Sequence, residues 1–289
     1  MASLKEVKGR IATVTNTQKI TSAMKMVASA KLHKAQTAIG NMLPYEQRLH
    51  TLLTNLLSGN SEISSDFSVS REVKRIALVV FSSNSSLCGA FNSNIIREAD
   101  GWIKQYEYLG RENILIYPVG KKVADALIKQ GYSIEGDFQE MAAKPSFQEA
   151  ALLAENLMGM YQKGEIDQVD VLYHHFKNTA SQVLTKQIYL PIDFSDNGPA
   201  DGQKYETDYI LEPSKEEVLE QLIPKVLRLK LYTILLDSNA SEHAARTMAM
   251  QIATDNANDL LQELTLMYNK TRQQAITNEL LDIVGGQMA

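Results

Sequence analysis

Helical hydrophobic spacing dominates the C-terminal end of the chain. The stretch from 214 to about 284 contains a single proline, Pro224, and no glycine. Ser214 and Glu217 form a capping box at its start, and the pair Gly285-Gly286 is expected to end it. At 1.5 Å per residue such a helix would span about 105 Å, several times the diameter of a small domain. The pattern therefore predicts one continuous helix that must lie along another structure.

The N-terminal end has the same character. Ser3 and Glu6 form a second capping box, and helical spacing continues to Ile39. Leucines between 49 and 57 keep this spacing, so the helix is expected to run on to about Ser58, although Pro44 can bend it.

The two terminal helices are predicted to pack together as an antiparallel coiled coil. Apolar positions in both recur at the alternating spacings of three and four residues that mark an a/d seam. These positions are Leu4, Val7, Ile11 and Val14 in the first helix and Ala253, Ala257, Leu260, Leu264, Met267 and Thr271 in the second. Two ordinary long helices of a helical bundle are the alternative.

Between these helices the period of the pattern changes. Residues 58–70 are rich in serine and acidic residues, which is typical of a linker, and the all-apolar run Ile76–Phe81 predicts a strand buried on both faces. Further strands are expected at Ile114–Tyr117 and near Ile134. Helices are expected at Asn94–Tyr108, about Lys121–Lys129 and Ser146–Gln162. Two last strands, Val169–Phe176 and Gln182–Leu190, are expected to form a hairpin, and Asp196–Thr207 is expected to be a loop.

This alternation indicates an α/β domain of Rossmann-like type with a largely parallel sheet. The expected fold class is therefore α/β, with a long antiparallel coiled coil of the N- and C-terminal helices and the α/β domain in the middle. The corresponding domains are residues 1–58, residues 73–210 and residues 211–289.

Composition narrows the class of protein. Apolar residues make up 44% of the chain, enough for a core, but the longest apolar run is Ile76–Phe81, too short to cross a bilayer. The N-terminus has no apolar segment of the signal-peptide kind, so we expect cytosolic synthesis without export. The single cysteine, Cys88, excludes an internal disulfide and any Cys-based zinc motif.

The charge of the chain is unevenly distributed. The net charge is −5, yet residues 1–40 carry a local balance of +6. The basic residues there are Lys5, Lys8, Arg10, Lys19, Lys25, Lys31 and Lys34, against Glu6 alone. An acidic protein surface is the expected partner of this helix. Nucleic acid is not, because the aromatic interleaving of single-strand binders and any groove-reading motif are missing.

No catalytic group, cofactor site or metal site is predicted. The loop Ser82–Phe91 follows the first strand, where doubly wound folds bind ligands, but it has neither GxGxxG nor GxxxxGK[ST]. His174 and His175 are adjacent on a predicted strand, so they point to opposite faces and cannot converge on one substrate. Cys88 is expected to be a small buried thiol.

Five long motifs distributed over the chain resemble those of one family. They are Asn16–Ala28, Ser241–Arg246, Ala253–Ala257, Tyr268–Gln273 and Ile276–Gly286. Over its full length the chain resembles the γ subunit of bacterial F-type ATP synthases. It departs from the family at Asn84-Ser85-Ser86, where Asp-Arg-Gly is common, and at Gln287, where alanine is common. The cysteine-bearing insertion of chloroplast members is missing, so thiol control of rotation is not expected.

The resemblance implies a non-catalytic rotor subunit. In such proteins the coiled coil is the axle inside a hexamer of α and β subunits, and the α/β domain is the foot that sits with ε on the membrane c-ring. One copy per complex couples ion flow to ATP synthesis or hydrolysis at sites on β. The implied location is peripheral, on the cytoplasmic face of the bacterial inner membrane.

The resemblance also implies contact residues. Those near the upper axle are Arg272, Gln273, Thr277 and Glu279, those of the lower contact with β are Met24, Lys25 and Arg246, and Tyr209 is a candidate for the ring contact. Guanidinium and amide groups suit contacts that are broken and remade, because their hydrogen bonds to carboxylates are directional. Each of these residues could instead be a solvated surface group.

Two other functions are compatible with the element pattern. An α/β enzyme with helical arms would bind a nucleotide or other small ligand by itself, and a structural tether would bridge its partners without turning. Neither accounts for the terminal motifs.

Overall fold

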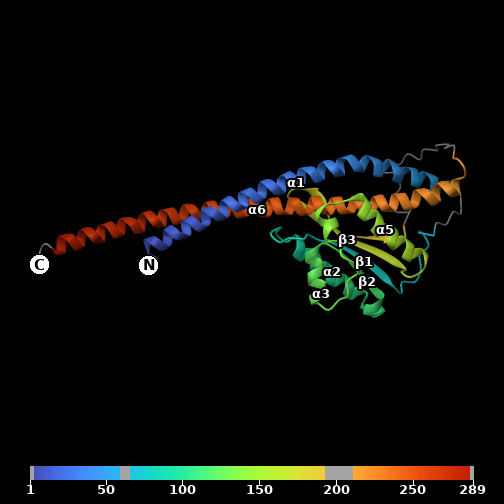
Figure 1. The fold of residues 1–289 in the computed structure, drawn as a ribbon, viewed down its shortest axis with the longest axis horizontal. Coiled ribbons are helices and arrows are strands. Elements are labelled where there is room, and N and C mark those ends of the chain that lie inside the picture. Colours follow the sequence, from blue (N-terminus) through green and yellow to red (C-terminus); the bar gives the residue numbers. More distant parts are fainter. Residues whose placement is uncertain (1–2, 59–65, 193–210, 287–289) are drawn as a thin grey trace.

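The two terminal helices lie side by side along the long axis of the molecule (Figure 1). The computed structural model describes residues 3–58, 66–192 and 211–286. Helix α1 (Leu4–Ser58) and helix α6 (Lys215–Gly286) run antiparallel, so both described termini lie at one end, and an α/β domain packs against the helices at the other end. The predicted fold class is confirmed.

Both helices begin at their predicted caps. The Ser3 hydroxyl accepts a hydrogen bond from the Glu6 amide at 3.3 Å, and the Ser214 hydroxyl accepts one from the Glu217 amide at 3.2 Å. Helix α1 continues through Pro44, and α6 continues through Pro224 for 72 residues. At 1.5 Å per residue, α6 is about 108 Å long.

The predicted seam is confirmed in α1 and partly wrong in α6. Val7 is buried in α1, and Ala257 and Leu264 are buried in α6. Leu260 and Met267, however, are 43% and 49% exposed, while their C-terminal neighbours Leu261 and Tyr268 are half-buried in the seam. Leu260 and Leu261 are adjacent, as are Met267 and Tyr268, so either member of each pair keeps the alternating spacing of three and four residues. Packing against α1 decides which member is buried.

Further down, small residues let the two helices approach closely. Ala240 and Ala244 of α6 are fully buried and pack with Leu32 and Ala35 of α1. With no side chain beyond Cβ, alanine narrows the distance between helix axes without breaking either helix. The shaft is thin at this level for that reason.

The α/β domain contains a four-stranded sheet in the order β2-β1-β3-β4. Strand β1 (Ile76–Phe81) pairs in parallel with β2 (Ile114–Val119) and with β3 (Gln168–Asn178), and β4 (Ser181–Leu190) pairs antiparallel with β3. The predicted largely parallel sheet and the final hairpin are both confirmed. The helices are α2 (Phe91–Gln105), α3 (Lys121–Lys129), α4 (Gln139–Ala143) and α5 (Phe147–Gln162), with the 3-10 turns η1 (Glu107–Leu109) and η2 (Arg111–Asn113).

Two local predictions are wrong, and a third concerns residues outside the described ranges. The strand predicted near Ile134 does not form: one backbone bond, from the Glu135 amide to the Ile116 carbonyl at 2.7 Å, joins this segment to β2, and Ile134 only packs on the core. Helix α2 ends at Gln105 and is followed by η1, so the helix predicted to Tyr108 is too long. The loop predicted at 196–207 lies outside the described residues.

Strand β1 divides the core into two layers, as its all-apolar sequence predicts. Ala77, Val79 and Phe81 face one layer, and the alternate side chains of β1 face the other. The first layer includes residues of α5, of α6 (Leu219, Ile223, Leu227, Leu231 and Leu235) and of α1 (Leu49, Leu53 and Leu56), whereas the second is formed with α2 and α3. The lower parts of both long helices therefore belong to the core of the domain.

We expect acid to destabilise the chain through His174, which is buried against Phe91 at 4.3 Å between ring centroids. Burial lowers the pKa of His174 from 6.5 to about 4. Between these values the unfolded state binds the proton and the folded state does not, so stability is complete above pH 6.5 and falls as the pH decreases toward 4. The expected loss from pH 7 to pH 5 is about 2 kcal/mol.

Urea unfolding at a series of pH values measures this slope. In His174→Phe the decline should be shallower than in the wild type, while His33→Gln, at an exposed position of α1, should leave it unchanged. Identical slopes for the wild type and His174→Phe would contradict the assignment. His243, whose pKa burial also lowers to about 4, should keep a residual slope in the first variant.

Candidate functional surfaces

The crevice at which doubly wound folds bind ligands is closed by the chain itself. A helix N-terminus after β2 would offer free N–H groups to a phosphate. In this structure the first amides of α3 are already bonded to the loop after β1: Lys121 to Asn84 Oδ1 at 2.9 Å, Lys122 to the Ser83 carbonyl at 3.1 Å, and Val123 to Ser82 Oγ at 3.1 Å. No donor is left there for an anion.

Gly120 shows how closely the two loops approach. It has a φ of +110°, and a Cβ at this position would lie 2.3 Å from the carbonyl oxygen of Ser82. Only glycine fits this contact. The loop that follows β1 is thus packed directly against the start of α3.

Helix α6 fixes the same loop through Arg246. The guanidinium donates to the carbonyl oxygens of Ser86 and Ser85 and forms an ion pair with Glu242 at 2.7 Å. The side chains of Arg246 and Glu242 are 10% and 12% exposed. Burial raises the pKa of Glu242, and Arg246 opposes this effect. The shaft and the domain are therefore joined by a buried, charge-assisted contact.

Arg246 differs from the other residues predicted to contact β, because most of its N–H donors already bond to groups of this chain. The segment Asn84-Ser85-Ser86, which departs from the family pattern, also has a structural role. The Asn84 side chain accepts a hydrogen bond from the Lys121 amide, and the Ser85 and Ser86 carbonyls accept hydrogen bonds from Arg246. The i,i+4 spacing of Glu242 and Arg246 was a signal available in the sequence that pointed to their pairing.

Lys25 lies higher on the shaft and bridges the two helices. Its ammonium group donates to Gln251 Oε1 at 2.5 Å, and the amide of Gln251 donates to Asp255 at 2.8 and 2.9 Å. Lys25 and its neighbour Met24 are half-buried. Sequence reasoning missed Gln251 and Asp255 as partners of Lys25, because pairing across two helices depends on their register.

The upper end of α6 extends beyond the start of α1 (Figure 1). Arg272, Gln273, Thr277 and Glu279 are all exposed there, and the Thr277 hydroxyl donates to the Gln273 carbonyl of its own helix at 2.9 Å. Four apolar side chains of the same segment are 48–63% exposed: Ile276, Leu280, Leu281 and Ile283. An exposed apolar helix end of this kind is suited to enclosure by other protein subunits.

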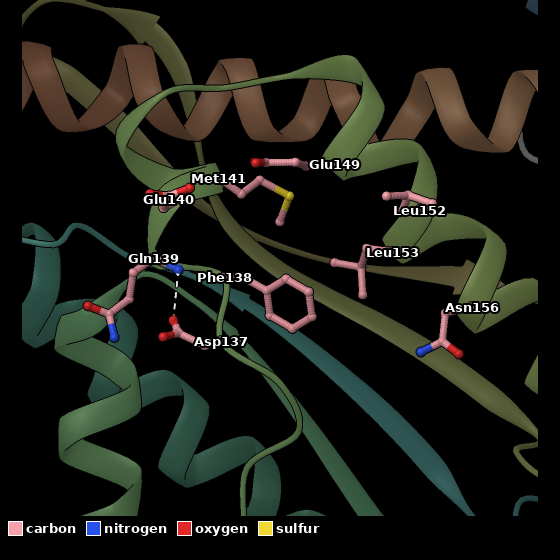
Figure 2. A pocket seen from close by; sticks show the side chains of 9 residues that line it. All are labelled: Asp137, Phe138, Gln139, Glu140, Met141, Glu149, Leu152, Leu153 and Asn156. Atoms are coloured by element: carbon pink, nitrogen blue, oxygen red, sulfur yellow. Dashed lines mark hydrogen bonds between the residues drawn. The ribbon is translucent and has the colours of Figure 1, made fainter.

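A cavity of about 570 Å³ lies between α4 and α5 (Figure 2). Its apolar lining includes Phe138 and Leu153, and its carboxylates are Asp137, Glu140 and Glu149. Asp137 accepts a hydrogen bond from the Gln139 amide at 3.1 Å. No lysine, arginine, histidine or cysteine is among the residues that line this cavity.

The remaining candidates for chemistry are held apart. His174 is buried on the side of β3 that faces Phe91, whereas His175 is exposed and contacts Asp237 at 2.6 Å, so the predicted opposite orientation is confirmed. Cys88 is buried, as predicted. Within the described residues no group of histidine, cysteine and acidic side chains is arranged to hold a metal ion. None of the helices described is both long and apolar enough to span a bilayer.

Tyr209 lies outside the described residues.

These features define the class of the protein. A shaft of about 100 Å, joined by buried contacts to an α/β domain, has the architecture of a mechanical subunit of an assembly. A family model described as ATP synthase matches residues 3–289. The chain belongs to the ATP synthase gamma chain family.

Curated relatives and solved structures agree with this assignment. The chain is 66% identical over 289 residues to the ATP synthase gamma chain of Phocaeicola vulgatus and 60% identical over 291 residues to that of Bacteroides fragilis, with 100% of each chain covered in both comparisons. The central stalk and c-ring structure of the Tetrahymena thermophila mitochondrial ATP synthase is 28% identical, with a TM-score of 0.55, over 81% of this chain and 99% of that one.

A chain of the Euglena gracilis mitochondrial ATP synthase has the same fold. Its TM-score is 0.68 at 24% identity, over 99% of this chain and 93% of that one. As a gamma chain, the protein is the non-catalytic rotor subunit of the central stalk.

We expect Arg246 to hold the shaft to the domain through its bonds to the Ser85 and Ser86 carbonyls, with Glu242 on the same helix orienting its guanidinium. Arg246→Met leaves the Glu242 carboxylate buried without its partner, so the free energy of unfolding should fall by about 3 kcal/mol. Adding Glu242→Gln removes the uncompensated charge and should restore part of the loss. Urea unfolding of the two variants measures both effects. Equal stability of the wild type and Arg246→Met would show that the pair does not hold the loop.

Proposed function

We propose that this chain turns inside a hexamer of α and β subunits and couples ion flow through a membrane c-ring to ATP synthesis or hydrolysis on β. The observation that carries the proposal is the apolar end of α6, which has no partner helix and exposes Ile276, Leu280, Leu281 and Ile283. Exposure of such a surface to water is unfavourable, which favours enclosure of the helix end by other subunits. A ring of subunits would enclose the thin helix and still allow it to turn.

Below this end, the outer sides of the shaft also present apolar residues. Ile20, Met26 and Val27 of α1 and Ile252 and Leu266 of α6 are more than half exposed. Basic residues alternate with them on α1, where the local charge is +6 over residues 1–40. This combination suits partners that offer both apolar and acidic groups, which is the expectation for loops of β subunits.

The shape of the shaft supports one copy in each complex. Two antiparallel helices of different sequence have no rotational symmetry, so a single shaft on the axis of a ring presents a different side to each β subunit. Turning the shaft then changes which side each β subunit meets. Differential contacts of this kind are what allows a non-catalytic chain to alter affinity at distant catalytic sites.

Torque between the ring and the hexamer needs a stiff connection. Here the lower part of α6 is inside the core of the α/β domain, and Arg246 fixes the loop after β1. We assign the foot role, together with contacts to ε and the c-ring, to this domain, and Tyr209 is kept as a candidate for the ring contact. The proposed location is peripheral, on the cytoplasmic face of the bacterial inner membrane.

We assign the upper contact with β to Arg272, Gln273, Thr277 and Glu279 and the lower contact to Met24, Lys25 and Arg246. The side chains of Arg272 and Gln273 are exposed and free to form charge-assisted bonds with carboxylates. The bond from Lys25 to Gln251 means that β would meet Lys25 as part of a network that spans both helices.

Replacing Arg272 and Gln273 by alanine should lower ATP hydrolysis by the assembled complex about tenfold, because two directional polar contacts to β are lost. Nucleotide binding to isolated β should not change. The matched control is Gln262→Ala with Glu263→Ala, also exposed on α6 but lower on the shaft. Equal turnover in the two double variants would contradict the assignment of Arg272 and Gln273.

A covalent lock separates a rotor from a tether. Tyr108→Cys places a thiol at an exposed site of the domain, and the native Cys88 is buried and does not compete for oxidation. Joining this thiol to a cysteine on a stationary subunit should stop ion-coupled ATP synthesis until the bond is reduced. A similar bond from Leu281→Cys to the hexamer should be less harmful, because a single helix end can swivel about its backbone. Full coupled synthesis with the domain locked would refute rotation.

A further inference from the structure

A second cavity, of about 520 Å³, opens where α1, α6 and the segment after α4 meet. We call it the basic groove. It is lined by Lys31, Lys34, Ala35, Ala38, Ala143, Lys144, Pro145, Tyr232, Leu236, Asn239 and His243. These residues come from three parts of the sequence that are far apart, so only the packing of both long helices against the domain creates the groove.

Three lysines line the groove, and the charge of Lys31 also acts on the nearby Glu242 carboxylate, where it opposes the rise in pKa that burial causes. Lys31 and Lys34 come from α1, Lys144 follows α4, and no carboxylate is among the lining residues. Across the described ranges, no acidic side chain lies within ion-pair distance of any of the three. The carboxylate of Glu242, on the same helix as His243, is already paired with Arg246 at 2.7 Å. The groove therefore attracts anions.

A buried imidazole also lines the groove. His243 is only 8% exposed, and its Nδ1 has no hydrogen-bond partner in the described parts of the chain. Burial, followed by the charges of Lys31 and Arg246, lowers the pKa of His243 to about 4, so the ring is neutral. The groove wall at His243 is therefore polar but uncharged.

The wall of the groove is apolar. Ala35 and Leu236 are buried, and Tyr232 is held in place by Phe147, whose ring lies edge-on at 5.6 Å between centroids. The volume falls in the range typical of sites for small molecules. The groove thus combines a cationic rim with a rigid surface against which an apolar body can pack.

We propose that the basic groove binds a small organic anion, with its phosphate or carboxylate group among Lys31, Lys34 and Lys144 and its apolar body against Tyr232 and Leu236. Such a ligand touches α1, α6 and the segment after α4 at once, so it braces the shaft against the domain. This role is additional to rotation and does not depend on the contacts with β.

Calorimetry on the full-length chain tests the proposal with three probes: naphthyl phosphate, inorganic phosphate and naphthol. Naphthyl phosphate should bind with one site per chain, and each of the other two, which carries only half of the recognised chemistry, should bind at least about tenfold more weakly. Lys34→Gln combined with Lys144→Gln should weaken naphthyl phosphate about tenfold. Lys5→Gln combined with Lys8→Gln, exposed on α1 away from the groove, should not.

Three results would overturn the proposal. The first is no measurable binding of naphthyl phosphate, and the second is equal weakening by the two pairs of lysine variants. The third is binding to the isolated chain that is lost in the assembled complex, because the groove would then be covered by an acidic surface of a partner subunit. Full coupled synthesis with the domain locked would refute rotation but would leave these binding measurements unaffected, so the two proposals fail separately.

Discussion

Burial of the lower part of α6 in the core of the α/β domain is the interaction on which the rest of the structure depends. Ile223, Leu227 and Leu231 pack in the same cluster as strand β1, and the helix then continues without a break to Gly286. Because the helix continues unbroken out of the domain, a turn of the domain carries the two-helix shaft with it. Flexible linkage at this place would leave a shaft that could not carry torque.

The same packing engages the amides at which related folds bind a phosphate. Arg246 on α6 fixes the loop after β1, and this loop satisfies the amides at the start of α3. The donors that would bind a phosphate in a related fold instead hold the loop in place. A fold does not by itself determine a function. At the position of the ligand crevice, this chain has contacts that join the loop after β1 to α3 and α6.

Stability is distributed unevenly along the molecule. The lower helices share one layer of core with the sheet, whereas the apolar contact of the upper shaft is a narrow seam in which Val7, Ala257 and Leu264 are buried. At the tip even this seam ends. An isolated chain therefore exposes apolar surface that is covered only when the shaft is enclosed, and assembly stabilises the part of the chain that folding alone leaves marginal.

The sequence by itself determined the elements whose signals are local. Capping boxes at Ser3 and Ser214 located the helix starts, continuous helical spacing predicted their length, and the all-apolar run Ile76–Phe81 identified the central strand. Tertiary structure decided what depends on register and approach: the choice of Leu261 over Leu260 in the seam, the loss of the strand near Ile134, the burial of Arg246 and the convergence of Lys31 and Lys144. Local patterns record the preferences of a segment for helix or strand, whereas contacts between distant segments depend on packing geometry that no single segment contains.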